Sequence, residues 1–204
     1  YRLPGQGWYA PSLMDADQAG VVVRGIEEWV RVLKSGAGAT AVVNGPMAEV
    51  VSGSTQYLSL EDLCAMASYL APSSESSGHL ASAEGLPAHV PSVEAKGAGA
   101  RLYERHCSSC HGEQGRGVDG AYPALAGNRA VLMPQTSNLV RMVLEGGYGP
   151  STQENPRPHG MPPFRLVLRD EEVAAVLSYV RNAWGNSAPP VLPLDVLRDG
   201  GAVH

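Results

Sequence analysis

The chain has 204 residues, a formal net charge of -5 and no apolar run long enough to span a bilayer. This mild negative charge argues against a nucleic-acid partner, which would need a basic surface. One phenylalanine stands against 24 glycines and 16 prolines. Such a composition predicts short helices joined by long loops, with a cofactor completing the core. The three cysteines are not a disulfide framework, because Cys64 stands far from the pair Cys107 and Cys110.

Residues 1–71 contain one clear amphipathic pattern and one methionine in a Gly-Pro turn. The segment "DLCAMASYL" at 62–70 has apolar residues at the spacing of one helix face, and Ser59 with Asp62 is suited to cap that helix. Cys64 is expected to be a small buried hydrophobe on it. The turn "NGPM" at 44–47 presents Met47, which the second half of the chain helps to interpret.

Residues 72–92, "PSSESSGHLASAEGLPAHVPS", are rich in serine, proline and glycine and predict a linker between domains. The next segment, "VEAKGAGARLYERHC", predicts a helix on which Gly99 and Tyr103 share one face. A glycine there would let a second helix cross closely.

This helix runs into "CSSCH" at 107–111, the attachment pattern of c-type heme. Cys107 and Cys110, three residues apart at a helix end, can reach both vinyl groups of one porphyrin, and His111 then lies beneath the iron as an axial ligand. A redox dithiol or half of a zinc site are the alternatives. Zinc needs about four ligands and no second cysteine pair exists. A thioredoxin-like motif would follow a strand, not a helix.

The segment "YPALAGN" at 122–128 is the first expected neighbour of the heme. The Pro123 carbonyl is placed to accept a hydrogen bond from His111 Nδ1–H, which would fix the ring orientation. Leu125 is expected to pack on the porphyrin. The alternative is an ordinary loop with one buried leucine.

The segment "HGMPPF" at 159–164 supplies the expected second axial ligand. Its prolines restrict the backbone of the loop that carries Met161, and a stiff loop retains a weak thioether ligand. Phe164 completes the expected heme environment. His159 is the competing ligand, and an ordinary loop histidine is the favoured interpretation of it.

Two further helices are expected in this half. Residues 136–145 predict a helix that ends at Gly146. A closing helix is expected to start near "RDEEV", because Val173, Val176, Leu177 and Val180 recur at i, i+3, i+4 and i+7, and Tyr179 on it would meet Tyr103. The tail, 185–204, is expected to cover the surface or to meet a partner.

The first half repeats the second at an offset of about 110 residues. Four matches occur in the same order: "PSL" 11–13 with "PAL" 123–125, "WVRVLKSG" 29–36 with "LVRMVLEG" 139–146, "GPM" 45–47 with "HGM" 159–161, and "DLCAMASYL" 62–70 with "EVAAVLSYV" 172–180. Met47 is therefore expected to be an axial ligand of a second heme, whose Cys-x-x-Cys-His motif would lie before Tyr1. The alternative is a core methionine in a heme-free remnant.

In "GARLYERHCSSCHG", "YPALAGN", "HGMPPF" and "VAAVLSYVRNAWG", residues 93–184 resemble a class I cytochrome c domain. The resemblance implies a small helical fold, covalent heme, ligation by His111 and Met161, and one-electron transfer. The expected fold class is thus all-α, with tandem class I cytochrome c domains of which the first is incomplete at its N-terminus. The expected domains are an incomplete one at 1–71, the linker 72–92, a complete one at 93–184 and the extension 185–204.

"GWYAPSL", "GPMAEVVSGSTQYLSLEDLCAMASYL" and "RNAWGN" also resemble the multiheme cytochrome c subunits of membrane-bound periplasmic dehydrogenases, which act on alcohols, gluconate, sorbitol or aldehydes. That resemblance implies an electron-transfer subunit with heme c, and no catalytic site of its own. It would pass electrons from a dehydrogenase catalytic subunit to a quinone or a terminal oxidase. The alternative is a multiheme redox enzyme, of the peroxidase or thiosulfate dehydrogenase type.

The implied location is the bacterial periplasm. Contact with the periplasmic face of the inner membrane would come through partners or through segments outside this sequence.

Overall fold

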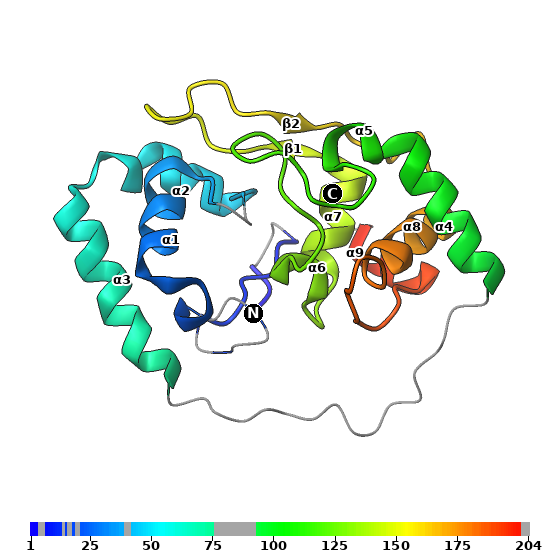
Figure 1. Ribbon diagram of the computed structural model, residues 1–204, viewed down its shortest axis with the longest axis horizontal. Helices are drawn as coiled ribbons and strands as arrows, with labels where there is room; N and C mark the ends of the chain where they lie inside the picture. Colours follow the sequence, from blue (N-terminus) through cyan, green and yellow to red (C-terminus); the bar gives the residue numbers. More distant parts are fainter. Residues whose placement is uncertain are drawn as a thin grey trace.

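The computed structural model of the chain describes residues 1–3, 7–13, 15, 18, 21–38, 42–75 and 93–200. Helices from the two halves of the sequence form two groups that lie side by side (Figure 1). The first group contains α1 (Val21–Ser35), α2 (Pro46–Gly53), the 3-10 helix η1 (Thr55–Tyr57) and α3 (Leu60–Glu75). The second contains α4 (Val93–His106), α5 (Ser108–His111), α6 (Arg129–Leu132), α7 (Ser137–Glu145), α8 (Asp170–Val180) and α9 (Pro193–Gly200).

Apart from helices, the described residues form two short strands. These strands, β1 (Gly147–Tyr148) and β2 (Gly160–Met161), pair antiparallel, with Gly147 opposite Met161. The prediction of a helical fold is therefore confirmed, but Met161 lies on a strand and not in the irregular loop expected for it. Within the described ranges, no helix combines the length and apolar content needed to cross a bilayer.

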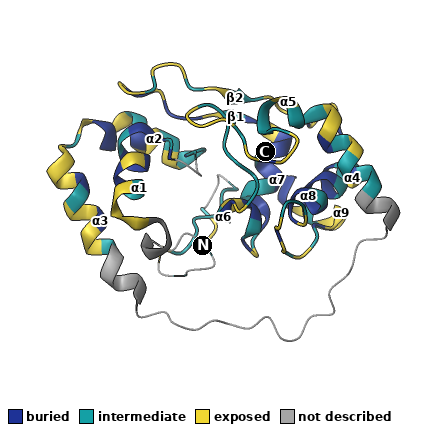
Figure 2. Ribbon diagram, viewed as in Figure 1, coloured by how far each residue is buried: buried dark blue, intermediate teal, exposed yellow. Residues whose placement is uncertain are grey.

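Each group of helices has its own buried apolar cluster (Figure 2). In the second half, α8 buries the predicted stripe of Val173, Val176, Leu177 and Val180. In the first half, α1 and α3 enclose a smaller cluster of Val30, Leu33, Leu63 and Ala67, with Cys64 half-buried against it. Cys64 thus packs on the core as expected, but it is half-buried and not buried.

The predicted helix ends are confirmed at three places. The Asp62 amide donates to Ser59 Oγ at the start of α3, at 3.1 Å. Glu172 caps α8 by accepting from the Arg169 amide. Gly146, at φ 65°, ends α7 with its amide on the Met142 carbonyl. Left-handed backbone of this kind favours glycine.

The boundaries of the linker and the tail need correction. Helix α3 continues to Glu75, so residues 72–75, expected in the linker 72–92, are helical. The remainder of that linker lies outside the described residues. The tail 185–204 does not only cover the surface, because its helix α9 buries Val196 against α7 and α8. Residues 201–204 lie outside the described part.

Polar side chains join the two helical groups along a seam. Asn138, on α7, brackets the Tyr9 peptide by donating to its carbonyl at 2.7 Å and accepting from its amide at 2.8 Å. Arg2 pairs with the buried Asp199 on α9 at 2.5 Å. At the other end, the Gln153 amide donates to Gln56 Oε1 at 3.1 Å. These bonds fix segments that are about 100 or more residues apart in the sequence.

Candidate heme site

Helix α4 delivers the Cys-x-x-Cys-His motif onto the short helix α5. The Cys107 amide bonds to the Tyr103 carbonyl at 2.9 Å, so the backbone continues from one helix to the other. Gly112 then ends α5 at φ 76°. The Tyr103 hydroxyl donates to the Gly112 carbonyl at 2.6 Å, which ties the end of the motif back to α4. Burial, with smaller effects from Cys107 and Tyr179, raises the pKa of Tyr103, so the hydroxyl remains a donor.

His111 is oriented as the sequence predicted. Its Nδ1 lies 2.9 Å from the Pro123 carbonyl oxygen, and because a carbonyl can only accept, Nδ1 carries the proton. This leaves Nε2 as the free nitrogen for a metal. Burial lowers the pKa of His111 and outweighs the opposing effect of the bond to Pro123. The neutral imidazole that a metal requires is therefore favoured.

Both thiols are free, and the Cys107 thiol does not have the character of a redox-active cysteine. Burial, with a smaller effect from Cys110, raises the pKa of the Cys107 thiol to about 11. Redox-active cysteines instead have a lowered pKa. Within the described ranges, no three His, Cys, Asp or Glu side chains gather as a metal site. The redox-dithiol and zinc interpretations therefore have no support, and the chemistry of the donor set fits covalent heme.

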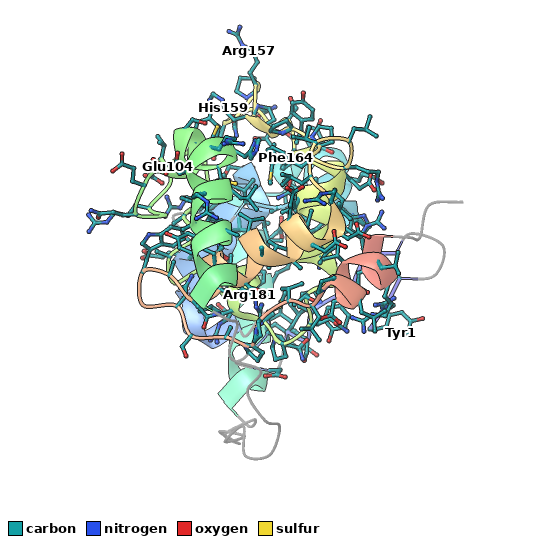
Figure 3. The ribbon with its side chains drawn as sticks, turned by 90° about the vertical axis from the view of Figure 1, so that its right-hand side faces the viewer. Tyr1, Glu104, Arg157, His159, Phe164 and Arg181 are labelled. Carbon is teal, nitrogen blue, oxygen red and sulfur yellow. The ribbon has the colours of Figure 1, made fainter. Side chains whose placement is uncertain are left out.

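The remaining predicted residues pack against the large core cluster or belong to it. Cys107, Leu125 and Met161 are each half-buried against it, and Phe164 belongs to it. Figure 3 shows Phe164 among the helices, with His159 at the outer edge of the molecule. His159 is exposed and contacts Tyr122 in a tilted arrangement, with ring centroids 4.9 Å apart, as expected of a loop histidine. The structure thus packs the Met161 thioether and the Cys107 thiol against one apolar core, and Cys110 and His111 lie on α5, which follows Cys107 directly.

Backbone contacts hold the Met161 segment in place. Its strand pairs with β1, and the Phe164 amide bonds to the Val143 carbonyl at 3.0 Å. A methyl group added at Gly146 would lie 2.8 Å from the carbonyl carbon of Pro162, so α7 ends directly against this segment. Strand pairing and close packing therefore add to the stiffness that the prolines provide.

Sequence reasoning missed two residues that hold the loop after His111, residues 113–127. Trp184, at φ 54°, packs on Gly115 and donates from Nε1 to the Glu113 carbonyl at 3.1 Å. Asn186 accepts from the Gly127 amide at 2.8 Å and donates to the Leu125 carbonyl at 3.1 Å. A tryptophan in left-handed backbone is uncommon and indicates a constrained position. The sequence "WGN" at 184–186 was the available signal for both residues.

Replacing Gly117 by alanine tests the support of His111. Gly117 has φ 63°, and a methyl group there would lie 2.7 Å from the Pro123 carbonyl carbon. The Pro123 segment must move, which weakens its bond to His111 and makes the imidazole a less basic ligand. We expect a higher midpoint potential of the holoprotein in voltammetry, and a loss of about 1–3 kcal/mol beyond the control in chemical unfolding.

Gly120→Ala is the matched control. Gly120 has a similar φ of 70°, but no atom lies within 4 Å of the added methyl group. The control carries only the backbone penalty, about 1–2 kcal/mol. Equal potentials in the two variants would show that the Pro123 carbonyl does not tune the ligand.

Comparisons with known proteins agree with this geometry. The family model described as Cytochrome c matches residues 97–184. Cytochrome c-552 of Thermus thermophilus is 34% identical over 92 residues, which are 44% of this chain and 70% of that protein.

Two longer relatives match nearly the whole chain. The cytochrome c subunit of alcohol dehydrogenase (quinone) from Gluconobacter oxydans is 36% identical over 189 residues, covering 91% of this chain and 40% of the relative. The fructose dehydrogenase cytochrome subunit of Gluconobacter japonicus is 33% identical over 206 residues, covering 90% and 42%. The chain thus spans about two fifths of the length of these relatives. From the site and these matches together, the chain belongs to the cytochrome c family, whose cofactor is covalently bound heme c.

Proposed function

We propose that this chain is an electron-transfer part of a dehydrogenase complex, receiving electrons from a catalytic subunit and passing them to a quinone or a terminal oxidase. The observation that carries the proposal is the pair of rigidly held candidate ligands, His111 on the Pro123 carbonyl and Met161 on a strand pair. With His111 and Met161 both bound to the iron, no coordination position would be left for a substrate. The names of the longer relatives, as cytochrome subunits of dehydrogenases, support the same role.

In this proposal each residue of the site has one task. Cys107 and Cys110 would form the thioether bonds, His111 and Met161 would bind the iron, and the apolar Leu125 and Phe164 would exclude water. When bound, heme c supplies a one-electron couple, whose potential the ligands and their burial adjust. The bond to the Pro123 carbonyl orients the imidazole, and burial keeps it neutral.

The proposal extends to the domains. Residues 93–184 form a complete cytochrome c domain, and 1–71 the C-terminal portion of another. Support comes from the buried positions that match at the repeat offset, Val30 with Val140 and Leu63 with Val173. Met47 is then an axial ligand of a second heme. Its side chain is 36% exposed on α2, unlike a core methionine, whereas Val51 of the same helix is fully buried.

Among the residues that the structure describes, none supports the multiheme-enzyme alternative. It needs an iron with an open position or with Cys/His ligation. Cys64 is packed against the core of the first half, and His159 is exposed on Tyr122. We propose the bacterial periplasm as the location, with contact to the membrane through partners or through other parts of the protein.

Spectroscopy of the holoprotein tests the electron-transfer role. We expect a low-spin spectrum in both oxidation states, rapid reduction by a reduced dehydrogenase of this class and no turnover of peroxide, since both axial positions are filled. Stopped-flow absorption with the dehydrogenase, and a peroxidase assay, provide the measurements. A high-spin iron or peroxide turnover would refute the role.

A further inference from the structure

The loop that leads to Met161 is longer than its counterpart in the first half. Gly146 and Gly36 hold the same place in the repeat, directly after α7 and α1. Met161 follows Gly146 by 15 residues, whereas Met47 follows Gly36 by only 11. The second half therefore has four additional residues in the loop that carries its candidate ligand.

This longer loop extends onto the first half. In Figure 1 the chain between β1 and β2 passes over the group of helices that contains α2. Gly149 and Pro150 are both buried there. A methyl group at Gly36 would collide with the Pro150 ring, and one at Gly149 would lie 3.1 Å from Val42 Cγ1. The loop 147–155 thus packs against the methionine loop of the first half.

Buried polar groups fasten the loop to the first half. Thr152 is 5% exposed and donates from Oγ1 to the Ser35 carbonyl at 3.3 Å. Gln56 is 6% exposed on η1, accepts from the Gln153 amide at 3.1 Å and donates from Nε2 to the Ser151 carbonyl at 3.4 Å. Buried groups that lose such partners are costly, so the loop cannot leave the first half freely.

A short path leads from these bonds to the candidate ligand. The loop begins with β1, which pairs with β2 and places Gly147 opposite Met161. Gly147 also lies near the turn before Met47, because a methyl group there would be 3.9 Å from Asn44 Oδ1. Moving Met161 away from the heme would therefore require that the strand pair break or that the loop be pulled out of the first half.

We propose that the first half clamps the Met161 ligand, with Gln56 and Thr152 as positioning residues that act through the loop 147–155 and β1. Bound and released Met161 form a two-state equilibrium, which any bond made only in the bound state shifts toward ligation. The clamp would keep the thioether on the iron and other ligands off it. The inference rests on the proposed ligation by Met161.

Imidazole binding to the ferric holoprotein measures the clamp, because added imidazole can reach the iron only when Met161 leaves it. Gln56→Ala removes both bonds from Gln56 to the loop. We expect imidazole to bind roughly five- to thirtyfold more tightly, the factor that corresponds to one or two net hydrogen bonds. The far-red band of Met-ligated heme should also disappear at a lower temperature than in the unsubstituted protein.

Thr152→Val provides an independent variant, since it removes the hydroxyl at nearly unchanged shape. It should shift imidazole affinity and the far-red band in the same direction by a smaller factor. If Gln56→Ala gives no folded holoprotein, Thr152→Val decides alone. An unchanged imidazole affinity in the folded variants would overturn the proposal.

Asn138→Ala is the matched control on the same seam. It removes the bracket on the Tyr9 peptide but no bond to the loop 147–155. We expect a lower melting temperature and an unchanged imidazole affinity. If Asn138→Ala tightens imidazole binding as much as Gln56→Ala does, general loosening of the seam releases the ligand and the proposed clamp is wrong.

Met161→Leu separates this inference from the ligation on which it rests. A far-red band that is absent from the unsubstituted protein, or that persists in Met161→Leu, would refute both the ligation and the clamp. A band that Met161→Leu removes, together with an unchanged imidazole affinity in Gln56→Ala and Thr152→Val, would refute the clamp and leave the ligation standing.

Discussion

Leucine in place of Met161 should leave the protein folded with its heme attached, but remove the thioether from the iron. Leucine has nearly the volume of methionine, so the packing cost should stay below about 1.5 kcal/mol. The far-red charge-transfer band of Met-ligated ferric heme should disappear and the midpoint potential should fall, because a thioether favours the reduced iron. Absorption spectroscopy and voltammetry of the purified variant measure both effects, and the open position should bind added imidazole.

Met133→Leu is the matched control for this change. Met133 is buried in the second half, 3% exposed, and belongs to no predicted ligand set. Its replacement should alter stability slightly and the spectrum not at all. If Met161→Leu keeps the far-red band, then the axial ligand is another residue. His159→Ala would next show whether His159 fills that position, despite its exposure on Tyr122.

The sequence predicted well those parts of the site that depend on neighbours in the chain. The attachment motif, the glycine that ends α7 and the Ser59–Asp62 cap all involve groups within a few residues of one another. Even the Pro123 bond to His111 spans only twelve residues. Helical periodicity identified α8 because one face of that helix meets a single apolar core.

The parts that the sequence did not reveal depend on distant contacts. Arg181 follows α8 and would be expected at the surface, yet it is fully buried and donates to the carbonyls of Pro189 and Met133 at 2.7 and 3.0 Å. Burial lowers its pKa to about 10. Figure 3 shows it at the end of the helical layer away from Phe164. No periodicity marks a residue whose partners are backbone carbonyls of other segments.

The seam between the halves was likewise invisible in the sequence. The repeat could indicate that each half has a similar architecture, but it contains no information on how two copies meet. The residues at the seam, such as Tyr9 with Asn138 and Gln56 with Gln153, are ordinary surface types when considered alone. Only the folded chain pairs them, and the pairing positions the Met47 half relative to the Met161 half.

Alanine at Gly99 should destabilise the holoprotein by roughly 1–3 kcal/mol, although alanine is the better helix former. The added methyl group would collide with the Ala175 carbonyl, which cannot move without separating α4 from α8. Because α4 runs directly into Cys107, we also expect incomplete covalent attachment of heme. Urea unfolding followed by absorption, and intact mass for the attached fraction, measure the two effects.

Gly97→Ala, two residues earlier on the same helix, gives the opposite expectation. There the methyl group would meet only the tip of the flexible Arg101 side chain at 3.4 Å. The helix preference of alanine should then stabilise the protein by about 0.5–1 kcal/mol. Opposite signs at two glycines of one helix can come only from the crossing with α8. The same sign at both positions would mean that α4 and α8 do not cross at Gly99.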